Sequence, residues 1–413
     1  MQYHKLSQFA GDVFFDLANF RYVRNITEDN DVGIAQYKNP RSSRLKKLVL
    51  LVTNHCNLSC SYCIAGKGTY TANTGCTVFE LEVLLGRIRS LLTLYPEGIS
   101  YIQLFGGEPL LALSKLEPLL AGIRSLFDRL SLRQPKFSVV TNGMLITSEV
   151  AALFRRYQIY TTVSLDGIGA IHDATRNRRG ECTYQTITNN LKLLASQQLT
   201  VEFSVTHVLI GQYQQGLIAE ILSEYISLGF RNIVLNIIYS PETIAAAEQH
   251  PQKLDALLHE YTDFMIAELH EDPYRLSDYA ISNAFITILR KKAVRHSCTA
   301  GVGSLTLTTD GQLQSCYLSE QVLAPASEWD LTEIAKKLET FQSVEAPDVC
   351  RTCWCQKLCT GWCREMLHGN VYSLKCRYIS IYLEKVISDV LKGMQDKTYL
   401  QQLVQNIKRF GSN

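Results

Sequence analysis

Short apolar runs alternate with amphipathic stretches of helical period from about residue 46 onward. Residues 113–130 and 147–157 are spaced to place their apolar side chains on one helical face. Repeated strand-then-helix order predicts a parallel sheet with right-handed crossovers. Six units are two short of a closed eight-stranded barrel, so we expect an α/β fold with a partial (β/α)6 TIM-like barrel. The six runs, rich in the Val, Ile, Leu, Phe and Tyr of buried parallel strands, are 46–54, 99–105, 136–142, 159–166, 200–208 and 230–239.

The pattern changes after about residue 270. A cysteine-dense segment with little helical period then predicts a second, small domain organised by metal, and the last residues return to the amphipathic pattern of a helical tail. The predicted ranges are an N-terminal segment (1–45), the barrel (46–270), a bridge (271–295), the cysteine-rich domain (296–377) and a C-terminal helical tail (378–413).

Charge and composition narrow the classes of partner. The 413-residue chain carries 41 basic and 39 acidic residues, a balance without the electrostatic footprint of nucleic-acid binding. Its N-terminus has no signal-peptide pattern, and no apolar run is long enough to span a bilayer. We therefore expect a cytoplasmic protein with neither a nucleic-acid nor a membrane partner. Thiols stay reduced in that compartment, so thirteen cysteines indicate metal binding.

Three of these cysteines form a C-x3-C-x2-C loop, "CNLSCSYC", directly after the first predicted strand. Structural zinc sites use four protein ligands, and the only nearby fourth ligand is His55, whose position next to Cys56 makes joint chelation poor. A [4Fe–4S] cluster held by Cys56, Cys60 and Cys63 leaves one iron open for another ligand. The loop therefore favours an iron–sulfur cluster over zinc.

Three further motifs follow predicted strands. They are "GGEP" at 106–109, "TNG" with Asn142, and "SLDG" at 164–167. In parallel α/β folds the chemistry lies at the carboxyl ends of the strands. Each motif alone is a common turn, but their order behind the three-cysteine loop predicts a single site.

This arrangement, with Tyr62 before the last cysteine of the loop, resembles the radical SAM superfamily. The resemblance implies that S-adenosylmethionine binds the open iron and is cleaved to a 5′-deoxyadenosyl radical, which removes a hydrogen atom from the substrate. It further implies a cofactor amino-group contact from the glycine-rich motif, ribose contacts from Ser164 and Asp166, and a carboxylate contact from Arg176 in "HDATR". The implied cofactor-binding residues are Tyr62, Gly106, Gly107, Glu108, Pro109, Asn142, Ser164, Asp166 and Arg176.

Seven distal cysteines are spaced C-x12-G-x4-C, C-x2-C-x5-C-x3-C and a single cysteine twelve residues later. This pattern resembles the SPASM domain of radical SAM peptide maturases. The resemblance implies two auxiliary [4Fe–4S] clusters, three clusters in all, with Cys355 left as a free thiol. A pair of structural zinc sites is the alternative, because C-x2-C occurs in both. The implied ligands are Cys298, Cys316 and Cys363 for the first auxiliary cluster, and Cys350, Cys353, Cys359 and Cys376 for the second.

Two departures from the family pattern bear on the reaction. Maturases with a fully ligated first auxiliary cluster have another cysteine upstream of Cys298, but here that stretch is "LRKKAVRHS". His296 is a candidate ligand, although an open iron is favoured. Sulfatase maturases carry an acidic residue where this chain has Tyr317, which argues against formylglycine formation.

The expected function is a peptide maturase that acts on a ribosomal precursor peptide, with flavodoxin or ferredoxin as electron donor. An open iron prefers thiolate, so a thioether crosslink is favoured and a carbon–carbon crosslink is the second possibility. A SPASM oxidoreductase that modifies a protein side chain without crosslinking is the enzymatic alternative. An iron–sulfur electron carrier or zinc scaffold is the non-enzymatic one, and the apparent nucleoside site argues against it. Residues 1–45 serve either peptide docking or ordinary packing.

Overall fold

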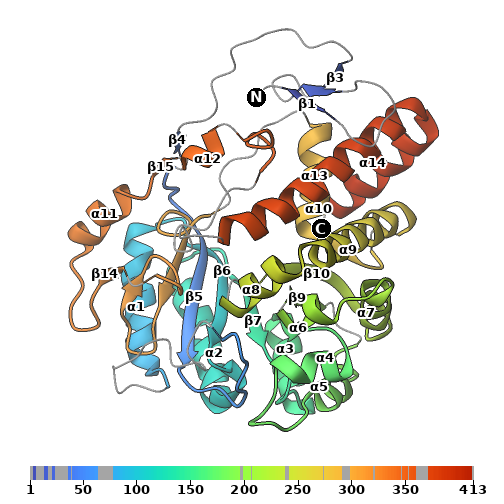
Figure 1. The fold of residues 1–413 in the computed structure, drawn as a ribbon. Coiled ribbons are helices and arrows are strands. Elements are labelled where there is room, and N and C mark those ends of the chain that lie inside the picture. The colour runs from blue at the N-terminus through green and yellow to red at the C-terminus, as the bar shows by residue number, and fades with distance from the viewer. Residues whose placement is uncertain are drawn as a thin grey trace. The chain divides into compact units, whose positions relative to one another are not determined.

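The chain was analysed as a computed structural model. It describes residues 3–5, 14–16, 21–23, 36–38, 40–63, 78–195, 199–205, 207–237, 241–272, 274–290, 298–319, 321–345, 347–351, 353–359 and 371–411. The chain divides into two compact units, and Figure 1 labels their helices and strands. We call residues 39–208 and 299–343 the sheet unit, and residues 1–38, 209–298 and 344–413 the helical unit.

The sheet unit is built on a mainly parallel sheet. Its strands follow the order β9-β8-β7-β6-β5-β12-β13-β14, and the pairs from β9 to β12 are parallel. The strands are β5 (Leu45–Thr53), β6 (Ile99–Gly106), β7 (Lys136–Thr141), β8 (Tyr160–Leu165), β9 (Leu199–Val205), β12 (Ser304–Leu307), β13 (Leu313–Gln314) and β14 (Val322–Ala324).

Burial explains why these runs form the centre of the sheet. From Leu48 to Thr53 every residue of β5 is buried, as expected for a strand covered on both faces. Strand β12 pairs with β5, with Ser304 opposite Lys47. It then turns back into β13 through Gly311, whose φ of +83° suits a tight turn. A β-hairpin thus forms at Gly311, whereas the pairing of β12 with β5 was not predicted.

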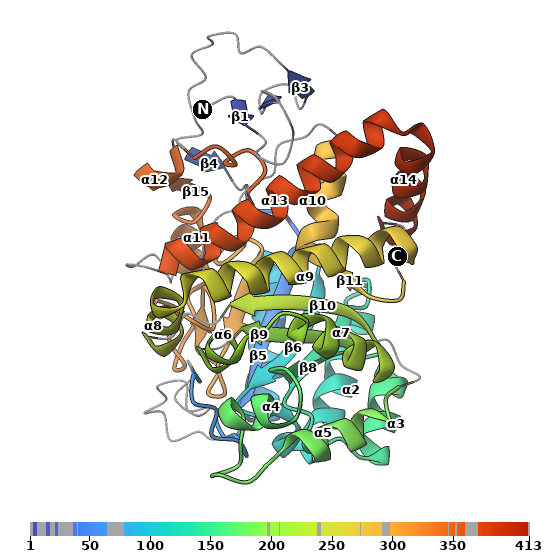
Figure 2. The same ribbon diagram turned by 45° about the vertical axis from the view of Figure 1, so that its right-hand side comes forward.

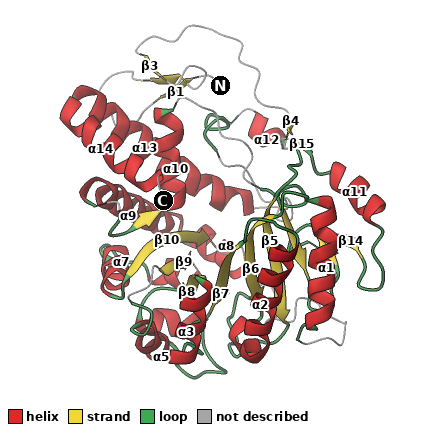
Figure 3. Cartoon of the chain, turned by 180° about the vertical axis from the view of Figure 1, so that it is seen from behind, coloured by secondary structure: helices red, strands yellow, loops and turns green. Residues whose placement is uncertain are grey.

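Helices connect the parallel strands. Figure 3 shows α1, α2 and α3 lying beside the strands of the sheet unit. Thr147 begins α3 by accepting a hydrogen bond from the backbone of Val150, a normal N-cap. The helices of this unit are α1 (Leu81–Leu94), the 3-10 helix η1 (Pro109–Ala112), α2 (Leu113–Arg129), α3 (Ser148–Tyr157), α4 (Gly169–Thr175), α5 (Tyr184–Leu191) and α11 (Leu331–Glu339). Helix α6 (His207–Gln212) contains the point in the sequence where one unit ends and the other begins.

The α/β fold with strand-then-helix units is confirmed. Five of the six predicted strands correspond to β5–β9, and no end differs by more than three residues. The sixth corresponds to β10 (Phe230–Ile237), which belongs to the helical unit and pairs in parallel with β11 (Ser277–Asp278). The predicted domain ranges remain a prediction.

The helical unit contains long helices that pack side by side. Helices α9 (Pro251–Glu271) and α13 (Val371–Gln395) contact each other, and Figure 2 shows them running together. The predicted C-terminal tail, 378–413, falls on most of α13 and on α14 (Lys397–Gly411), and α13 begins before it at Val371. The other elements are α7 (Leu217–Ser227), α8 (Pro241–Gln249), α10 (Tyr279–Leu289), α12 (Asp348–Arg351), and the short strands β1 (Tyr3–Lys5), β2 (Phe14–Asp16), β3 (Arg21–Val23), β4 (Gln36–Lys38) and β15 (Ser343–Glu345).

The N-terminal strands β1, β2 and β3 form an antiparallel meander. Of the helices that the structure describes, none is long and apolar enough to cross a membrane.

Candidate functional site

The three-cysteine loop leaves the carboxyl end of β5. Cys56, Cys60 and Cys63 are all partly buried, and the backbone N–H of Leu58 points at the sulfur of Cys56 over 3.5 Å. Burial raises the pKa of Cys56 to about 11 and also raises the pKa of Cys60. The guanidinium of Arg176 opposes the rise for both thiols. This positive group therefore favours the thiolate form that iron requires.

The glycine-rich motif packs against the backbone of this loop. A Cβ at Gly106 would lie 2.3 Å from the carbonyl oxygen of Thr53, and one at Gly107 would lie 2.0 Å from that of His55. The close approach allows the N–H of Gly107 to donate to Thr53 over 2.8 Å, and that of Glu108 to donate to His55 over 2.7 Å. Only glycine fits at these two positions, so the motif fixes the end of β6 to the start of the cysteine loop.

Glu108 is 1% exposed and both of its carboxylate oxygens accept hydrogen bonds. The donors are the N–H of Leu110 at 3.0 Å, the hydroxyl of Thr141 at 2.7 Å and the N–H of Asn142 at 2.7 Å. Burial raises the pKa of Glu108, although these hydrogen bonds oppose the rise. The carboxylate therefore caps η1, which begins at Pro109, and ties the end of β6 to that of β7. Its predicted contact with the cofactor stays a prediction.

Asn142 lies against the cysteine loop. Its amide nitrogen donates to the side-chain oxygen of Asn57 over 2.7 Å and lies 3.9 Å from the sulfur of Cys56. Its amide oxygen accepts from the N–H of Met144. Asn142 directly follows β7, as the sequence predicts, and lies near the first cysteine of the loop.

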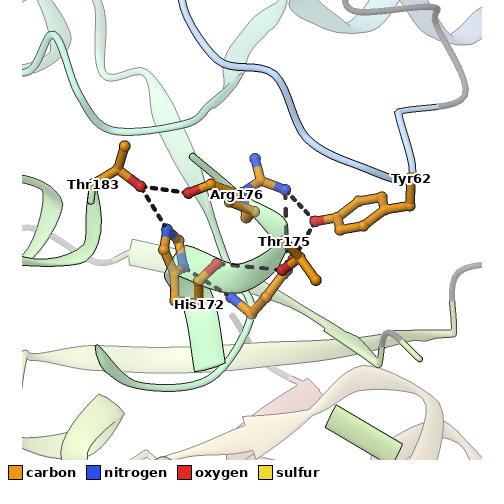
Figure 4. Close-up of polar contacts among 6 residues, drawn as sticks. Tyr62, His172, Thr175, Arg176 and Thr183 are labelled. Atoms are coloured by element: carbon orange, nitrogen blue, oxygen red, sulfur yellow. Dashed lines mark hydrogen bonds and ion pairs between the residues drawn. The ribbon is translucent and has the colours of Figure 1, made fainter. Parts of the chain in front are cut away.

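Tyr62, Asp166 and Arg176 meet in a hydrogen-bonded group in which Asp166 is buried and the other two residues are partly buried. The phenol of Tyr62 donates to Asp166 and accepts from Arg176 over 2.6 Å, as drawn in part in Figure 4. Thr175 also donates to Asp166, over 3.1 Å. Nε of Arg176 is buried without a hydrogen-bond partner among the described residues. Ser164, also predicted to contact ribose, is partly buried near the end of β8, two residues before Asp166.

The charges in this group support one another. Burial by itself would lower the pKa of Arg176, but Cys60, Tyr62 and Asp166 raise it well above its usual range. The guanidinium therefore stays charged beside the cysteine loop and near its carboxylate partner, Asp166, at 4.0 Å. A charged, partly unsatisfied guanidinium close to Cys56 and Cys60 suits an anionic ligand such as the carboxylate of an amino acid.

Sequence reasoning missed His172 and Thr183. His172 lies on α4 and is 0% exposed. Its Nδ1 accepts a hydrogen bond from the backbone N–H of Asp166 over 3.2 Å, and its Nε2 lies 3.2 Å from the hydroxyl of Thr183. Only its position between "SLDG" and Arg176 in the chain pointed toward the site, because a lone histidine on a short helix has no characteristic spacing.

The distal cysteines are only partly described. In the helical unit, burial and the proximity of Cys376, Cys359 and Cys353 raise the pKa of Cys350 to about 12. Cys350 is therefore within electrostatic range of the other three thiols, and the predicted ligand set of the second auxiliary cluster stays a prediction. Cys355 is buried, with its sulfur 3.5 Å from that of Cys353.

The predicted set for the first auxiliary cluster falls only partly within the described residues and stays a prediction. Cys298 ends one segment of the helical unit, Cys316 belongs to the sheet unit, and Cys363 and His296 lie outside the described residues. Within the described ranges, no three His, Cys, Asp or Glu side chains have the arrangement of a metal site. The cluster assignments therefore rest on the spacing and chemistry of the cysteines.

Comparison with known families identifies the class of the domain that carries the three-cysteine loop. Residues 50–244 match the Radical SAM superfamily. The chain therefore contains a radical SAM domain, and this family implies a [4Fe–4S] cluster and S-adenosylmethionine. The prediction of a radical SAM enzyme is confirmed at the level of this domain, and the fit is supported by the three thiols and the charged Arg176 beside them.

Two curated relatives match this region of the chain. An uncharacterised protein of Methanocaldococcus jannaschii is 26% identical over 195 residues, which are 47% of this chain and 63% of the relative. The radical SAM cyclopropyl synthase TigE of Paramaledivibacter caminithermalis is 25% identical over 178 residues, which are 39% of this chain and 35% of TigE. The chain thus spans less than two thirds of the length of either relative.

Solved structures share the fold over more of the chain. anSMEcpe with bound AdoMet and Cp18Cys peptide has a TM-score of 0.67 and 18% identity, and the match covers 84% of this chain and 98% of that one. Streptococcus suis SuiB bound to precursor peptide SuiA has a TM-score of 0.51 and 14% identity, and the match covers 78% of this chain and 72% of that one. At these identities the likeness shows the fold.

Proposed function

We propose that this protein is a radical SAM peptide maturase that installs a side-chain crosslink in a ribosomally synthesised precursor peptide. The observation that carries the proposal is the position of the loop with Cys56, Cys60 and Cys63 beside the partly buried group of Tyr62, Asp166 and Arg176. When bound, the cluster and S-adenosylmethionine supply a 5′-deoxyadenosyl radical. The residues of this chain bind and orient the cofactor, and their burial keeps water from the reacting atoms.

Each residue has a defined part in this proposal. Arg176 keeps its charge and binds the cofactor carboxylate, while Asp166 and Ser164 accept or donate hydrogen bonds to the ribose hydroxyls. The backbone of Gly106 and Gly107 holds the end of β6 against the cysteine loop. The amino group of the cofactor would bind at this glycine-rich motif. These roles require that the site bind a zwitterionic amino acid and a nucleoside together, which a simple electron carrier does not need.

A peptide substrate is supported by the fold and by the distal cysteines. Both solved structures reported above contain a peptide, and both share the fold of this chain. The proximity of Cys350, Cys353, Cys359 and Cys376 supports an auxiliary cluster in a SPASM domain. We propose three [4Fe–4S] clusters in total, a reducing electron donor such as flavodoxin or ferredoxin, and a cytoplasmic location.

Tyr317 bears on which modification is made. Its ring centroid lies 4.9 Å from that of Phe105, the residue directly before Gly106. The residue after Cys316 thus packs beside the glycine-rich motif, and here it is a phenol in place of the acidic residue of sulfatase maturases. This supports a crosslink over formylglycine formation. A thioether is the favoured crosslink, because Cys298, Cys316 and Cys363 supply three thiolates and leave room for a substrate thiolate.

Mass spectrometry of a co-expressed or co-incubated precursor peptide tests the proposal. A short open reading frame beside the gene, if one is found, would encode the candidate peptide. A crosslink makes the peptide lighter by two hydrogens, and a thioether also leaves one cysteine resistant to alkylation. A lighter peptide whose cysteines all alkylate would indicate a carbon–carbon crosslink. An oxidised peptide without any crosslink between its fragments would instead support the SPASM oxidoreductase.

A further inference from the structure

His172 is a fully buried histidine that the proposed chemistry does not use directly. It lies in α4, between the end of β8 and Arg176, and the ring of Tyr184 lies 5.6 Å from it. Figure 4 shows its two ring nitrogens pointing toward different partners. A buried imidazole with both nitrogens engaged is held in one orientation, so its hydrogen bonds determine its tautomer.

The direction of each hydrogen bond follows from the chemistry of its partner. The backbone N–H of Asp166 can only donate, so Nδ1 of His172 is the acceptor. In a neutral ring the proton then lies on Nε2, which donates to the hydroxyl of Thr183. That hydroxyl donates in turn to the carbonyl oxygen of Arg176 over 2.6 Å. The hydrogen bonds therefore all run in one direction, with Asp166 donating to His172, His172 to Thr183, and Thr183 to Arg176.

These hydrogen bonds link the two ends of the segment 166–176, which carries two predicted cofactor contacts. Asp166 begins the segment and Arg176 ends it, and their side chains meet at the phenol of Tyr62. The same segment is attached to the cysteine loop, because Ser59 donates to the carbonyl of Asn177 over 2.8 Å. The N–H of Ser61 likewise donates to the carbonyl of Thr175 over 3.0 Å.

We infer that His172 is a positioning residue for S-adenosylmethionine: through Thr183 and the backbone of Asp166, its neutral ring holds Asp166 and Arg176 in the geometry that binds the cofactor. The inference rests on the proposed function, because it assigns the role of His172 in that same site. His172 does not touch the cofactor. It lowers the cost of binding because the two contacting side chains are held in place before the ligand arrives.

A role in packing alone makes a different prediction from a role in positioning. If His172 and Thr183 only fill space, a substitution that keeps the volume of Thr183 leaves cofactor affinity unchanged. If the hydrogen-bond chain matters, the hydroxyl of Thr183 matters and its methyl group does not. Thr183→Val removes the hydroxyl and keeps the shape, while Thr183→Ser keeps the hydroxyl. This pair therefore separates the two roles without the larger risk of misfolding that His172→Phe carries.

The test measures the equilibrium affinity of the anaerobically reconstituted full-length protein for S-adenosylmethionine, together with iron content and thermal midpoint. We expect Thr183→Val to weaken binding about three- to tenfold with unchanged iron, and His172→Phe to weaken it further, about ten- to a hundredfold. Thr183→Ser should bind within about twofold of the wild type. Leu119→Ala opens a cavity on the buried face of α2, outside this segment. It is the control for loss of cofactor affinity through general destabilisation.

Each outcome decides the inference. Wild-type affinity in Thr183→Val would overturn it, and so would an equal loss in Thr183→Ser or in Leu119→Ala. The expected order of affinities would support it. A wild-type protein that holds its iron but does not bind S-adenosylmethionine would instead overturn the proposed function, and the two failures are therefore distinguishable.

Discussion

Arg176 donates a hydrogen bond of 2.6 Å to the phenol of Tyr62, and the Tyr62 hydroxyl donates a hydrogen bond to the carboxylate of Asp166. The tyrosine comes from the cysteine loop, whereas the other two residues flank α4. One phenol therefore joins the loop predicted to hold the cluster to the side chains predicted to hold the cofactor. The predictions below follow from this connection and from the burial around it.

Removal of the Tyr62 hydroxyl should weaken cofactor binding. Tyr62→Phe keeps the ring but leaves Arg176 and Asp166 without the group that links them. Hydrogen bonds to charged groups contribute about 1.5–3 kcal/mol, so the affinity for S-adenosylmethionine should fall roughly ten- to a hundredfold. Tyr101→Phe is the matched control, because Tyr101 is 46% exposed near the start of β6. Equal affinities in both variants would show that the phenol has no part in the site.

The carboxylate of Glu108 should contribute to stability as well as to the site. Its three donors, at Leu110, Thr141 and Asn142, all need an acceptor. Glu108→Gln replaces one acceptor oxygen by an amide that donates, and each buried unsatisfied group costs about 1–3 kcal/mol. We expect the free energy of unfolding to fall by about 2–4 kcal/mol in chemical denaturation.

The matched control for this substitution is Glu149→Gln. Glu149 is exposed in the first turn of α3, so its loss should change the free energy of unfolding by less than about 0.5 kcal/mol. Equal effects of the two substitutions would contradict the capping role assigned to Glu108.

Buried His172 should make the protein less stable as the pH falls. Burial and the charge of Arg176 lower its pKa from 6.5 to about 3, although Asp173 opposes the shift. The unfolded chain therefore takes up a proton below about pH 6.5, while the folded chain does not do so until about pH 3. The free energy of unfolding contributed by this site falls throughout that window and is unaffected above it.

Comparison with a variant isolates the contribution of this histidine. Between pH 6.5 and pH 5 the wild type should lose about 1–2 kcal/mol more than His172→Gln, which has no proton to gain. Equilibrium unfolding at several pH values measures the difference. Parallel pH profiles for the two proteins would mean that His172 is already protonated, or is accessible to water, in the folded state.

Among the distal cysteines, Cys350 should bind a cluster and Cys355 should not. Cys350→Ala removes a predicted ligand of the second auxiliary cluster, so the iron content should fall by about four atoms per chain. Cys355→Ala should leave iron unchanged, because Cys355 was predicted to be a free thiol. Iron and sulfide analysis after anaerobic reconstitution makes the comparison. Iron loss in Cys355→Ala and none in Cys350→Ala would reverse the assignment.

Hydrophobic pattern was sufficient to predict the parallel sheet and the sequence positions of the strand-end motifs. A buried run such as 46–54 has few alternatives to a central strand, and motifs that follow such strands gather at one edge. Cysteine spacing was equally informative, because the chelate geometry of a loop depends on residues a few positions apart. Both kinds of prediction use local information only.

Contacts between distant residues were not predictable in this way. The capping of η1 by Glu108 depends on Thr141 and Asn142 arriving from the next strand. The role of His172 depends on Thr183, eleven residues away, and on a backbone N–H that has no sequence code. The pairing of β12 with β5 joins segments some 250 residues apart, which periodicity does not encode.

Reductive cleavage of S-adenosylmethionine by the Cys60→Ala variant tests the central claim most directly. The wild-type protein, reconstituted and reduced under anaerobic conditions, should produce 5′-deoxyadenosine. Cys60→Ala should lose this activity, because two thiolates do not hold the cluster, while iron bound by the distal cysteines remains. Full cleavage activity in Cys60→Ala, or none in an iron-replete wild type, would contradict the assignment of this loop as the cofactor-cleaving site.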